Sequence, residues 1–484
     1  MGIADSLSTL ATLVRGTPSS VAAGDARLAV DCTADDPDAT DVDKQLSERI
    51  AEATAAFAAC IPPSDGAKES GYLVLNPFSF VRRIGLEMPQ LTALPKVEKP
   101  IYAAAESATT KHVVVDVPPM GFVWVTPASS PSKQRPSPLL AEDLRNRENL
   151  VVIRNEFLEA TINPTTGAMQ SLKDYGKRGN RLSQQLALRA GSSRGKVAQA
   201  WQDPDDRAEY SVMAADSVEV SAATTAYGEI VVSGRLLDRE GKLQAKYRQT
   251  FRLWRGTRVL HLEIELDPTV VPAADPWNAY YACRFAWADE AAELFRGVNQ
   301  IRQKAKRKKL EAPLYIEIGS GEMQTTVLTG GLPYHKRIGD RMLDTILSVR
   351  GERQKKFHLG LGVDLAQPHN EALGLLAAVT VAFQTASAPK SGASSWLFHI
   401  DARSVVATHW EPVAEGGAIV GVRVRLLETS GRSARARLSA FRPVRSARTL
   451  DFKGDSRGEC QLNEDRVQLE LSAGEWIELE VLWA

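Results

Sequence analysis

Residues 260–266 read Leu260-His261-Leu262-Glu263-Ile264-Glu265-Leu266, a strict alternation of apolar and polar side chains. Successive side chains of a β-strand point to opposite faces, so the alternation predicts a strand with one buried and one solvent-facing side. From about residue 149 onward, similar β-rich runs follow one another almost without a helical pattern. They cover residues 150–154, 157–162, 228–237, 244–254, 313–318, 374–383, 418–427, 433–441 and 466–482.

These runs are separated by turn signals such as Asn163-Pro164-Thr165-Thr166-Gly167. Strands this numerous, without interleaved helices, predict a large antiparallel sandwich over residues 149–484. Pro and Ser dominate the stretch before it, which predicts a linker at 127–148. A small β module is predicted over 70–126 from the short runs at 72–75, 81–88, 112–117 and 122–125. The predicted fold class is therefore mainly β.

One amphipathic helix is predicted near the N-terminus, at residues 43–61. Its apolar side chains recur at spacings of three and four, at Leu46, Ile50, Ala53, Phe57 and Ile61. Residues 1–40 are rich in Ala, Ser, Thr and Asp and predict a partly ordered lead-in, so 1–66 form one N-terminal segment. The apolar stripe needs a partner surface. It is expected to dock on the sandwich or to mediate self-association into a homo-oligomer.

Composition and charge indicate which binding partners and which cellular location to expect. The chain has 484 residues, with 59 Lys and Arg against 59 Asp and Glu. This balance disfavours a nucleic-acid or anionic-membrane partner, and the basic run at 302–309 is interpreted as an exposed loop or edge. Four cysteines are too few for a disulfide framework, and we expect reduced, mostly buried thiols. Neither a signal-peptide pattern nor a long apolar run is visible, which indicates a cytoplasmic protein.

Four segments resemble, in the same order, motifs of glycoside hydrolase family 38, the α-mannosidases. The first match to the motif "N-P-x-S-x-x-R" is Asn76-Pro77-Phe78-Ser79-Phe80-Val81-Arg82, and the second, to "P-P-x-G-[YF]", is Pro118-Pro119-Met120-Gly121-Phe122. The third runs from Asn155-Glu156-Phe157 through Thr166-Gly167 to Ser171-Leu172-Lys173-Asp174 and matches the family's "N-E-[FY] … T-G … S-L-x-D" segment. The fourth, to "R-L-x-E-x-x-G", is Leu426-Leu427-Glu428-Thr429-Ser430-Gly431-Arg432. The four matches lie in this order within residues 70–484.

The resemblance implies that 149–484 is a galactose-mutarotase-like supersandwich and that the helix at 43–61 is the last piece of a helical bundle. Family members also carry an α/β barrel with a zinc-binding His-x-Asp motif, a nucleophilic aspartate and an acid/base carboxylate. At most 148 residues precede the sandwich here, with one histidine, His112. We therefore expect no cofactor in this chain, zinc only in the missing barrel, and a barrel-bearing partner chain.

A first candidate binding segment is Asp275–Trp287, which gathers four aromatic residues around one arginine. Sugar rings stack their C–H faces on aromatic rings and need polar partners for their hydroxyls. At least one of the candidate residues Trp277, Tyr280 and Arg284 is therefore predicted to contact a sugar. The alternative interpretation is that the rings pack in the core.

A second candidate segment is Thr329–Arg337. It resembles a family stretch in which a Gly-Gly turn leads to a strand ending "H-R-R", and this resemblance implies a substrate contact by His335 and Arg337. The spacer after the glycines is shorter here, and Lys336 stands at the first of the two arginine positions. The alternative is an ordinary turn.

Two short pairs are weaker candidates for a metal site: His399 with Asp401, and His409 with Glu411. Residues two apart on a strand face the same side, so each pair could present a nitrogen and an oxygen to one ion. The alternative is a hydrogen bond at the edge of the sandwich. The family's zinc pair lies in the barrel, so the position of these pairs does not match it.

Three functional hypotheses follow. The first is a carbohydrate-binding C-terminal part of an α-mannosidase-like glycoside hydrolase, acting on mannoside-type glycans and not catalytic alone. The second is an independent sugar-modifying enzyme of the mutarotase or lyase kind, for which His335 with Asp340 or Asp344, or His399 with Asp401, would have to converge on one sugar oxygen. The third is a structural interaction module without sugar affinity.

Overall fold

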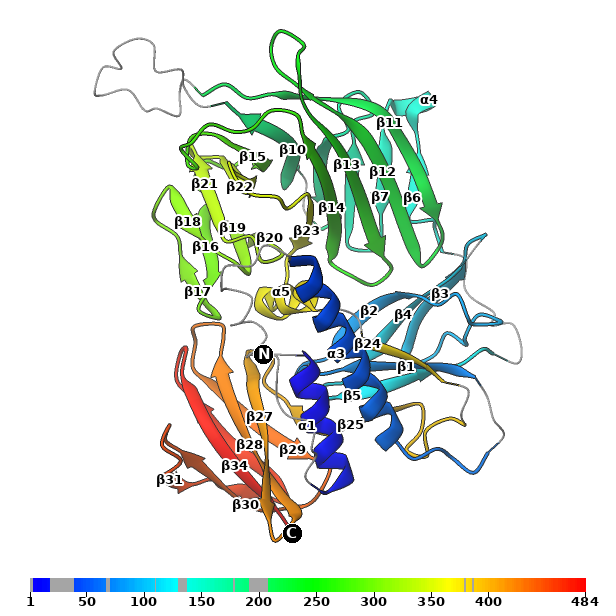
Figure 1. Cartoon of the computed structure of the whole chain (residues 1–484), viewed down its shortest axis with the longest axis vertical. Coiled ribbons are helices and arrows are strands. Elements are labelled where there is room, and N and C mark those ends of the chain that lie inside the picture. Colours follow the sequence, from blue (N-terminus) through cyan, green and yellow to red (C-terminus); the bar gives the residue numbers. More distant parts are fainter. Residues whose placement is uncertain are drawn as a thin grey trace. The chain divides into compact units, whose positions relative to one another are not determined.

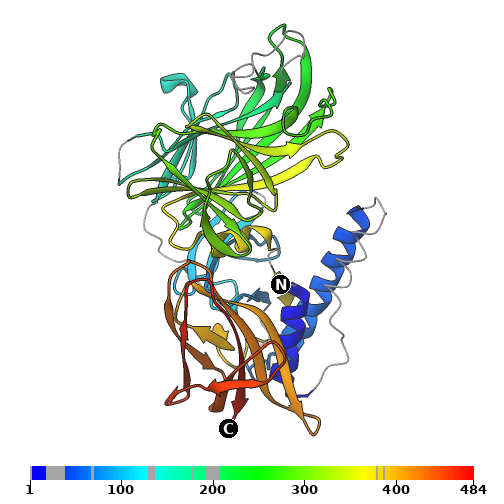
Figure 2. The ribbon, with the colours of Figure 1, turned by 90° about the vertical axis from the view of Figure 1, so that its left-hand side faces the viewer.

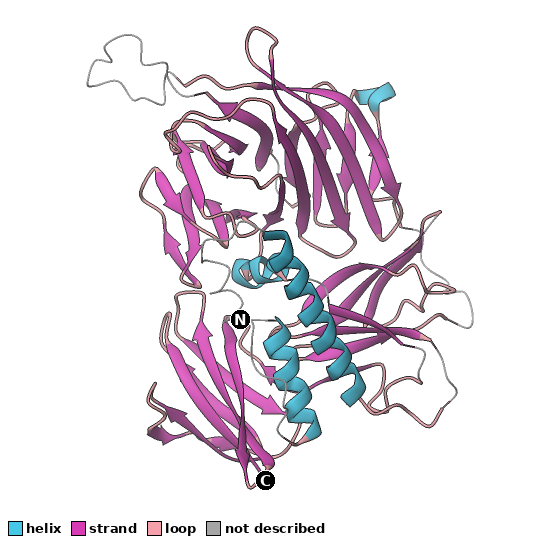
Figure 3. Ribbon diagram, in the orientation of Figure 1, coloured by secondary structure: helices cyan, strands magenta, loops and turns pink. Residues whose placement is uncertain are grey.

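The computed structural model describes residues 3–17, 39–66, 70–108, 110–128, 137–176, 179–190, 208–377, 380–384 and 387–484. Contacts divide the chain into two compact units. Unit 1 contains residues 1–104, 115–134 and 377–484, and unit 2 contains 105–114 and 135–376. The described residues are mostly strands with few helices (Figures 1 and 3), which confirms the mainly β fold class.

Unit 2 is built on two nine-stranded antiparallel sheets, as predicted for a large sandwich. The first sheet has the order β18 (Lys309–Glu311), β21 (Tyr334–Ile338), β22 (Met342–Ser348), β15 (Tyr280–Ala286), β10 (Leu182–Arg189), β9 (Met169–Asp174), β8 (Leu158–Ile162), β7 (Val151–Arg154) and β6 (Ala141–Asp143). The second has the order β11 (Val212–Ala223), β12 (Tyr227–Leu237), β13 (Leu243–Trp254), β14 (Val259–Pro268), β23 (Lys356–Val363), β20 (Met323–Leu328), β19 (Tyr315–Ser320), β16 (Glu293–Val298) and β17 (Ile301–Lys304).

Strand β14 has one buried and one solvent-facing side, as its alternating sequence predicts. Leu260, Leu262 and Ile264 are fully buried in the main apolar core of unit 2, whereas Glu265 on the opposite face is exposed. Burial of such side chains stabilises the sandwich by about 1.5–3 kcal/mol each. The basic run at 302–309 falls on β17 and β18, each the outermost strand of its sheet, in agreement with the expected edge position.

Two short helices accompany these sheets, α4 (Arg145–Glu148) and α5 (Pro368–Leu376). The predicted strand at 374–383 is wrong in its first half, because α5 ends at 376 and the strand that follows, β24 (Thr380–Gln384), belongs to unit 1. Proline is favoured in the first turn of a helix, so Pro368 suits the start of α5. The helix packs on β19, β20 and β23.

The described residues also form several smaller sheets, whose strands lie in unit 1 apart from residues 105–106 and 111–114. One has the order β24, β1 (Gly71–Asn76), β5 (Gly121–Val125) and β25 (Ser394–Trp396), and another has β2 (Arg82–Glu87), β4 (Lys111–Val117) and β3 (Ile101–Glu106). Two sheets are formed by the C-terminal residues. The first has the order β26 (Phe398–Ile400), β29 (Ala434–Ala440), β33 (Arg466–Leu471) and β32 (Leu462–Asn463). The second has the order β27 (Val405–Glu415), β28 (Ala418–Glu428), β34 (Trp476–Trp483), β30 (Val444–Leu450) and β31 (Ser456–Glu459).

The grouping of the C-terminal residues differs from the predicted domain division, which placed 149–484 in one sandwich. Residues 377–484 group with the N-terminal part of the chain because they share one apolar core with it. Leu7 and Leu10 near the N-terminus, Leu73 of β1 and Val424 of β28 are all buried in that core.

Two N-terminal helices lie in unit 1 where one was predicted. Helix α1 (Ile3–Arg15) occupies part of the expected lead-in, and α3 (Ala39–Cys60) covers the predicted helix. They lie side by side (Figures 1 and 2), with α1 also on β27 and α3 on β24. Ala53 and Phe57 of the predicted stripe are buried, so unit 1 itself provides the partner surface. None of the helices in the described ranges is long and apolar enough to cross a membrane.

The cysteines agree in part with the expectation. Cys283 is buried, whereas Cys60 and Cys460 are only partly so, and all three are free thiols. Cys32 lies outside the described residues.

Motif residues that resemble family 38 hold turns in place. The Asn76 side chain donates from Nδ2 to the carbonyl oxygens of Phe80 at 2.7 Å and Pro118 at 2.9 Å. Asn155 donates in the same way to the carbonyl oxygen of Trp254, at 2.9 Å. Buried polar groups are stable only when they are hydrogen-bonded, so each asparagine fixes the loops whose carbonyl groups it satisfies.

Glu428, from the last motif, has a similar structural role at the end of β28. Its carboxylate is fully buried and accepts hydrogen bonds from the backbone N–H groups of Ser430 at 2.9 Å, Gly431 at 2.8 Å and Gly474 at 3.1 Å. Burial opposes ionisation, but the hydrogen bonds from Ser430 and these N–H groups outweigh it and lower the pKa of Glu428.

Replacing Glu428 with glutamine should therefore lower the free energy of unfolding by about 1–3 kcal/mol, because the amide NH₂ would face N–H donors. The carboxylate stabilises the folded state above its unfolded pKa of about 4.3, and this contribution is lost as the pH falls through the lower folded pKa. Urea unfolding of both proteins at several pH values measures the difference. The exposed Glu415→Gln is the matched control, and an equal effect of both substitutions would refute the role assigned to Glu428.

Candidate functional site

The first predicted segment lies on β15 and the loop before it. Tyr281, Cys283 and Phe285 point into the core of unit 2. Tyr280 and Arg284 alternate with them and therefore point to the outer face of the sheet. Two of the three predicted sugar contacts thus lie on one strand face, next to the loop that carries Trp277.

A buried carboxylate organises this face. Asp344 of β22 lies opposite Arg284 in the sheet register, and Arg284 Nε donates to Asp344 Oδ1 at 2.8 Å. The hydroxyls of Tyr280 and Tyr210 donate to Asp344 Oδ2 at 2.9 Å and 3.1 Å. Arg189 of β10 donates in turn to the Tyr210 hydroxyl, at 2.6 Å. We call these five residues the Asp344 cluster.

The electrostatics of the Asp344 cluster suit a structural ion pair. Asp344 is fully buried and Arg284 is 7% exposed. Burial, together with the negative charge of Asp344, raises the pKa of Tyr210 to about 12 and also raises the pKa of Tyr280. Both phenols therefore stay protonated near neutral pH and serve as hydrogen-bond donors. The cluster ties β10, β15 and β22 together, and its carboxylate oxygens are already occupied.

Trp277 lies beside this cluster and is only partly buried. Its backbone is held by Asp275, whose carboxylate accepts from Trp277 N–H at 3.0 Å, and by Lys336, whose ammonium donates to the Trp277 carbonyl at 3.1 Å. The indole contacts Tyr334 edge to face, with ring centroids 5.9 Å apart, and the Lys309 ammonium lies 4.9 Å from the indole centroid.

Tyr334 is 49% exposed. We call Trp277, Tyr334 and Lys309 the Trp277 platform. The platform lies at one edge of the first sheet, on β18, β21 and the loop before β15. It offers aromatic surface and a cation. The indole also packs against the apolar cluster of Tyr280, Ala282 and Ile346. Such an arrangement can stack on a flat, partly apolar ligand.

His335 does not belong to this site. It is fully buried, with Nδ1 3.0 Å from Thr345 Oγ1 and Nε2 3.1 Å from the Ala312 carbonyl oxygen. Burial lowers its pKa to about 4, so the ring is neutral. The predicted substrate contact is out of reach in this structure because both ring nitrogens are hydrogen-bonded inside the sandwich.

The sheet register also separates His335 from Asp344. His335 lies opposite Thr345, whereas its neighbour Lys336 lies opposite Asp344. Because neighbouring residues of a strand point to opposite faces, His335 and Asp344 cannot converge on one sugar oxygen. Asp340 is exposed in the β21–β22 turn and does not reach the buried imidazole face. One of the two pairings considered for an independent sugar-modifying enzyme, His335 with Asp340 or Asp344, is thus not formed.

Arg337 shares its strand face with His335 and not with Asp344. Its Nη2 donates to the carbonyl oxygen of Asp340 at 2.9 Å, across the β21–β22 turn.

The Gly-Gly sequence before β21 forms a turn in which only glycine fits at position 330. Gly330 has a φ of +58°, and a Cβ there would lie 1.8 Å from the carbonyl oxygen of His358. The second predicted segment is therefore not assembled around one ligand.

The weak metal candidates are not gathered into a site. Asp401 accepts from the backbone N–H and Nε of Arg437, at 2.7 Å and 2.8 Å. Although burial opposes it, this bonding lowers the pKa of Asp401. His409 and Glu411 are exposed on β27, and His399 lies beside Trp396 with ring centroids 6.0 Å apart. Among the described residues, no three His, Cys, Asp or Glu side chains could hold a metal ion, so these pairs do not fit a zinc centre.

Sequence reasoning missed several residues of the site. Arg189 and Tyr210 of the Asp344 cluster, and Lys309 and Tyr334 of the Trp277 platform, come from segments far from β15 in sequence. One available signal was the charge of Arg189 at the end of the β-rich run Leu186-Ala187-Leu188, since a charged residue in such a run is buried only when it has a partner.

Comparison with solved structures shows what this fold is similar to. An α-mannosidase from Enterococcus faecalis V583 matches with a TM-score of 0.67 at 10% identity, covering 99% of this chain and 65% of that chain. A protein of glycosyl hydrolase family 38 from Enterococcus faecalis matches with a TM-score of 0.65 at 11% identity, covering 99% of this chain and 68% of that chain.

No family model and no curated protein matches the sequence. The present chain spans 65% and 68% of the length of the two structural neighbours. At 10–11% identity the likeness concerns the fold. The chain therefore has the fold of the larger part of these two glycoside hydrolase structures.

Proposed function

We propose that this chain is a carbohydrate-binding part of an α-mannosidase-like glycoside hydrolase, which binds mannoside-type glycans and depends on a separate catalytic barrel for hydrolysis. The Trp277 platform is the observation that carries this proposal. It presents partly exposed aromatic rings and an ammonium group at one edge of a large sandwich. The fold likeness to an α-mannosidase supports the choice of mannosides as ligands.

The platform suits a sugar for a physical reason. A pyranose ring has C–H groups that stack on an indole, while its hydroxyl groups need polar partners at the rim. Lys309 supplies a donor beside the indole. The hydrogen bonds of the Asp344 cluster connect the neighbouring strands, and this supports an indole that is already in place before a sugar binds.

The site lacks the chemistry of retaining hydrolysis, which needs two carboxylates about 5–5.5 Å apart, one nucleophilic and one protonated. Asp344 is paired with Arg284 and occupied by two phenols. The Trp277 backbone N–H holds the pKa of Asp275 below its usual value, so that carboxyl group is not a proton donor near neutral pH. In this proposal neither group therefore acts as the protonated acid.

We therefore expect the purified chain not to hydrolyse an aryl α-mannoside, with or without added zinc. Release of the aryl alcohol, followed by absorbance, measures this directly, and a family 38 α-mannosidase added to the same assay serves as the positive control. Turnover that requires zinc and copurifies with the chain would overturn the assignment of catalysis to another polypeptide.

A further inference from the structure

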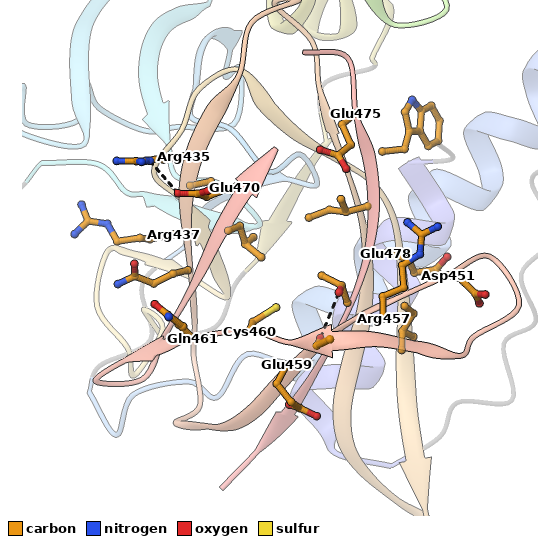
Figure 4. Close-up of a pocket in the computed structure, with 18 of the residues that line it drawn as sticks. Arg435, Arg437, Asp451, Arg457, Glu459, Cys460, Gln461, Glu470, Glu475 and Glu478 are labelled. Atoms are coloured by element: carbon orange, nitrogen blue, oxygen red, sulfur yellow. Dashed lines mark hydrogen bonds and ion pairs between the residues drawn. The ribbon is translucent and has the colours of Figure 1, made fainter. Parts of the chain in front are cut away.

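Unit 1 contains a cavity of about 840 Å³ in its C-terminal sheets, remote in sequence from the Trp277 platform. We call it the C-terminal cavity. Its lining comes from β29 and β33 of one sheet and from β30, β31 and β34 of the other. Figure 4 shows Arg435 and Glu470 on one side of the space and Arg457 and Glu478 on the other. The volume lies within the range of about 300–1,000 Å³ typical of ligand sites.

Carboxylates outnumber guanidinium groups two to one in the lining of the C-terminal cavity, so its charge is acidic. Six carboxylates and three guanidinium groups line it: Asp401, Asp451, Glu459, Glu470, Glu475, Glu478, Arg435, Arg437 and Arg457. Arg435 pairs with Glu470 at 3.0 Å, and Arg437 pairs with Asp401 at 2.8 Å. Within the described part of the chain, Arg457 and Glu459 belong to no ion pair and have exposed side chains. This balance disfavours phosphate, sulfate or acidic sugars as ligands.

The cavity also has exposed aromatic surface. Phe452 is 75% exposed and Trp476 is 39% exposed. The turn that carries Phe452 is ordered by Asp451, whose Oδ1 accepts from the backbone N–H groups of Lys453 at 2.8 Å and Asp455 at 2.9 Å. The exposed part of each ring is available to stack on a ligand in the cavity.

Amide groups complete the lining. Gln461 and Gln468 are exposed there, and each amide both donates and accepts hydrogen bonds. Together with the unpaired Arg457 and Glu459, they offer both hydrogen-bond donors and acceptors. Alternating hydroxyl groups of a neutral sugar match this pattern, and the sugar's C–H faces match the rings.

We infer that the C-terminal cavity is a second saccharide-binding site, specific for neutral oligosaccharides, with Trp476 and Phe452 as stacking surfaces. This site goes beyond the proposed function because it shares no residue with the Trp277 platform. Its occupation would give the chain a second place at which a glycan can bind.

The test uses the full chain carrying Trp277→Ala, in which the Trp277 platform no longer contributes. Calorimetric titration with mannotetraose and cellotetraose should show saturable binding to this background by at least one of them, and tetragalacturonate should not bind. Adding Trp476→Ala should weaken the binding by about tenfold or more, since one stacked ring is removed. Trp476→Phe should keep most of it, which separates stacking from folding.

Trp396→Ala is the matched control, because Trp396 also lies in unit 1, is 41% exposed and does not line the cavity. It should leave the affinity unchanged. The inference is overturned if neither neutral tetrasaccharide binds, if the acidic one binds as well, or if the Trp396 and Trp476 variants lose affinity equally. Failure of the Trp277 platform would instead appear as unchanged binding between the wild type and Trp277→Ala, so the two proposals fail separately.

Discussion

Replacing Asp344 with alanine should lower the free energy of unfolding by about 3–5 kcal/mol. The substitution leaves Arg284 buried without an anion and removes the acceptor of the Tyr280 and Tyr210 hydroxyls. An unpaired buried charge cannot recover its hydration, so the folded state carries the whole penalty. Urea unfolding followed by tryptophan fluorescence measures the change.

Two comparisons make this result specific. Asp340→Ala removes an exposed aspartate from the turn between β21 and β22 and should change stability by less than about 0.5 kcal/mol. Asp344→Leu combined with Arg284→Met removes both charges and should cost less than Asp344→Ala alone, because no charge is left unpaired. Equal losses for Asp344→Ala and Asp340→Ala would contradict the buried network.

Replacing Trp277 with alanine should weaken mannoside binding about ten- to hundredfold. A stacked aromatic face contributes about 1.5–3 kcal/mol when it is buried by the ligand, and 1.4 kcal/mol corresponds to one decade in the dissociation constant. Removal of the indole also takes away the ring that Tyr334 and Lys309 contact. Calorimetric titration of both proteins with short mannosides measures the change.

Tyr175→Ala is the matched control for this prediction. Tyr175 is 57% exposed in the same unit, directly after β9. The register pairs Leu172 with Leu182 and Ser183 with Ala286, so Tyr175 lies toward the far end of β15 from Trp277. Its removal should leave the affinity unchanged. Equal losses in the two variants would show that the binding does not depend on the platform.

The strands were largely predictable because the pleated sheet has a period of two. In β14 the apolar positions Leu260, Leu262 and Ile264 are those that the core buries. The motif residues at the turns were selected by resemblance to family 38, and the structure gives a physical reason for their residue types. Asn76, Asn155 and Glu428 satisfy backbone groups through their side chains, and such capping requires particular residue types at particular positions.

Helix α1 and the grouping of the C-terminal residues were not predictable from local pattern. Buried Leu7, Leu10 and Leu13 follow a helical spacing, but the Ser and Thr residues between them weaken the signal. The C-terminal strands alternate in the same way whichever core they join. Only contacts between segments far apart in sequence decide that 377–484 group with the N-terminal residues.

The candidate site was predictable only in part, because both faces of β15 carry aromatic residues. Tyr280 and Tyr281 look equivalent in sequence, yet the pairing of Arg284 with Asp344 places Tyr280 in the polar cluster and Tyr281 in the core. His335 was selected by resemblance, and the register places it on the buried face. Cross-strand register, which the sequence does not display, therefore selects the residues that form the site.

One measurement tests the central claim that this chain binds a mannoside without cleaving it: saturation-transfer NMR on the purified chain with methyl α-mannoside and short mannosides, with zinc present. We predict saturation transfer to the ring C–H protons, a marked decrease in the Trp277→Ala chain, and anomeric signals of the intact glycoside that persist throughout the incubation. Absence of transfer at millimolar sugar, or the appearance of free mannose, would contradict the account.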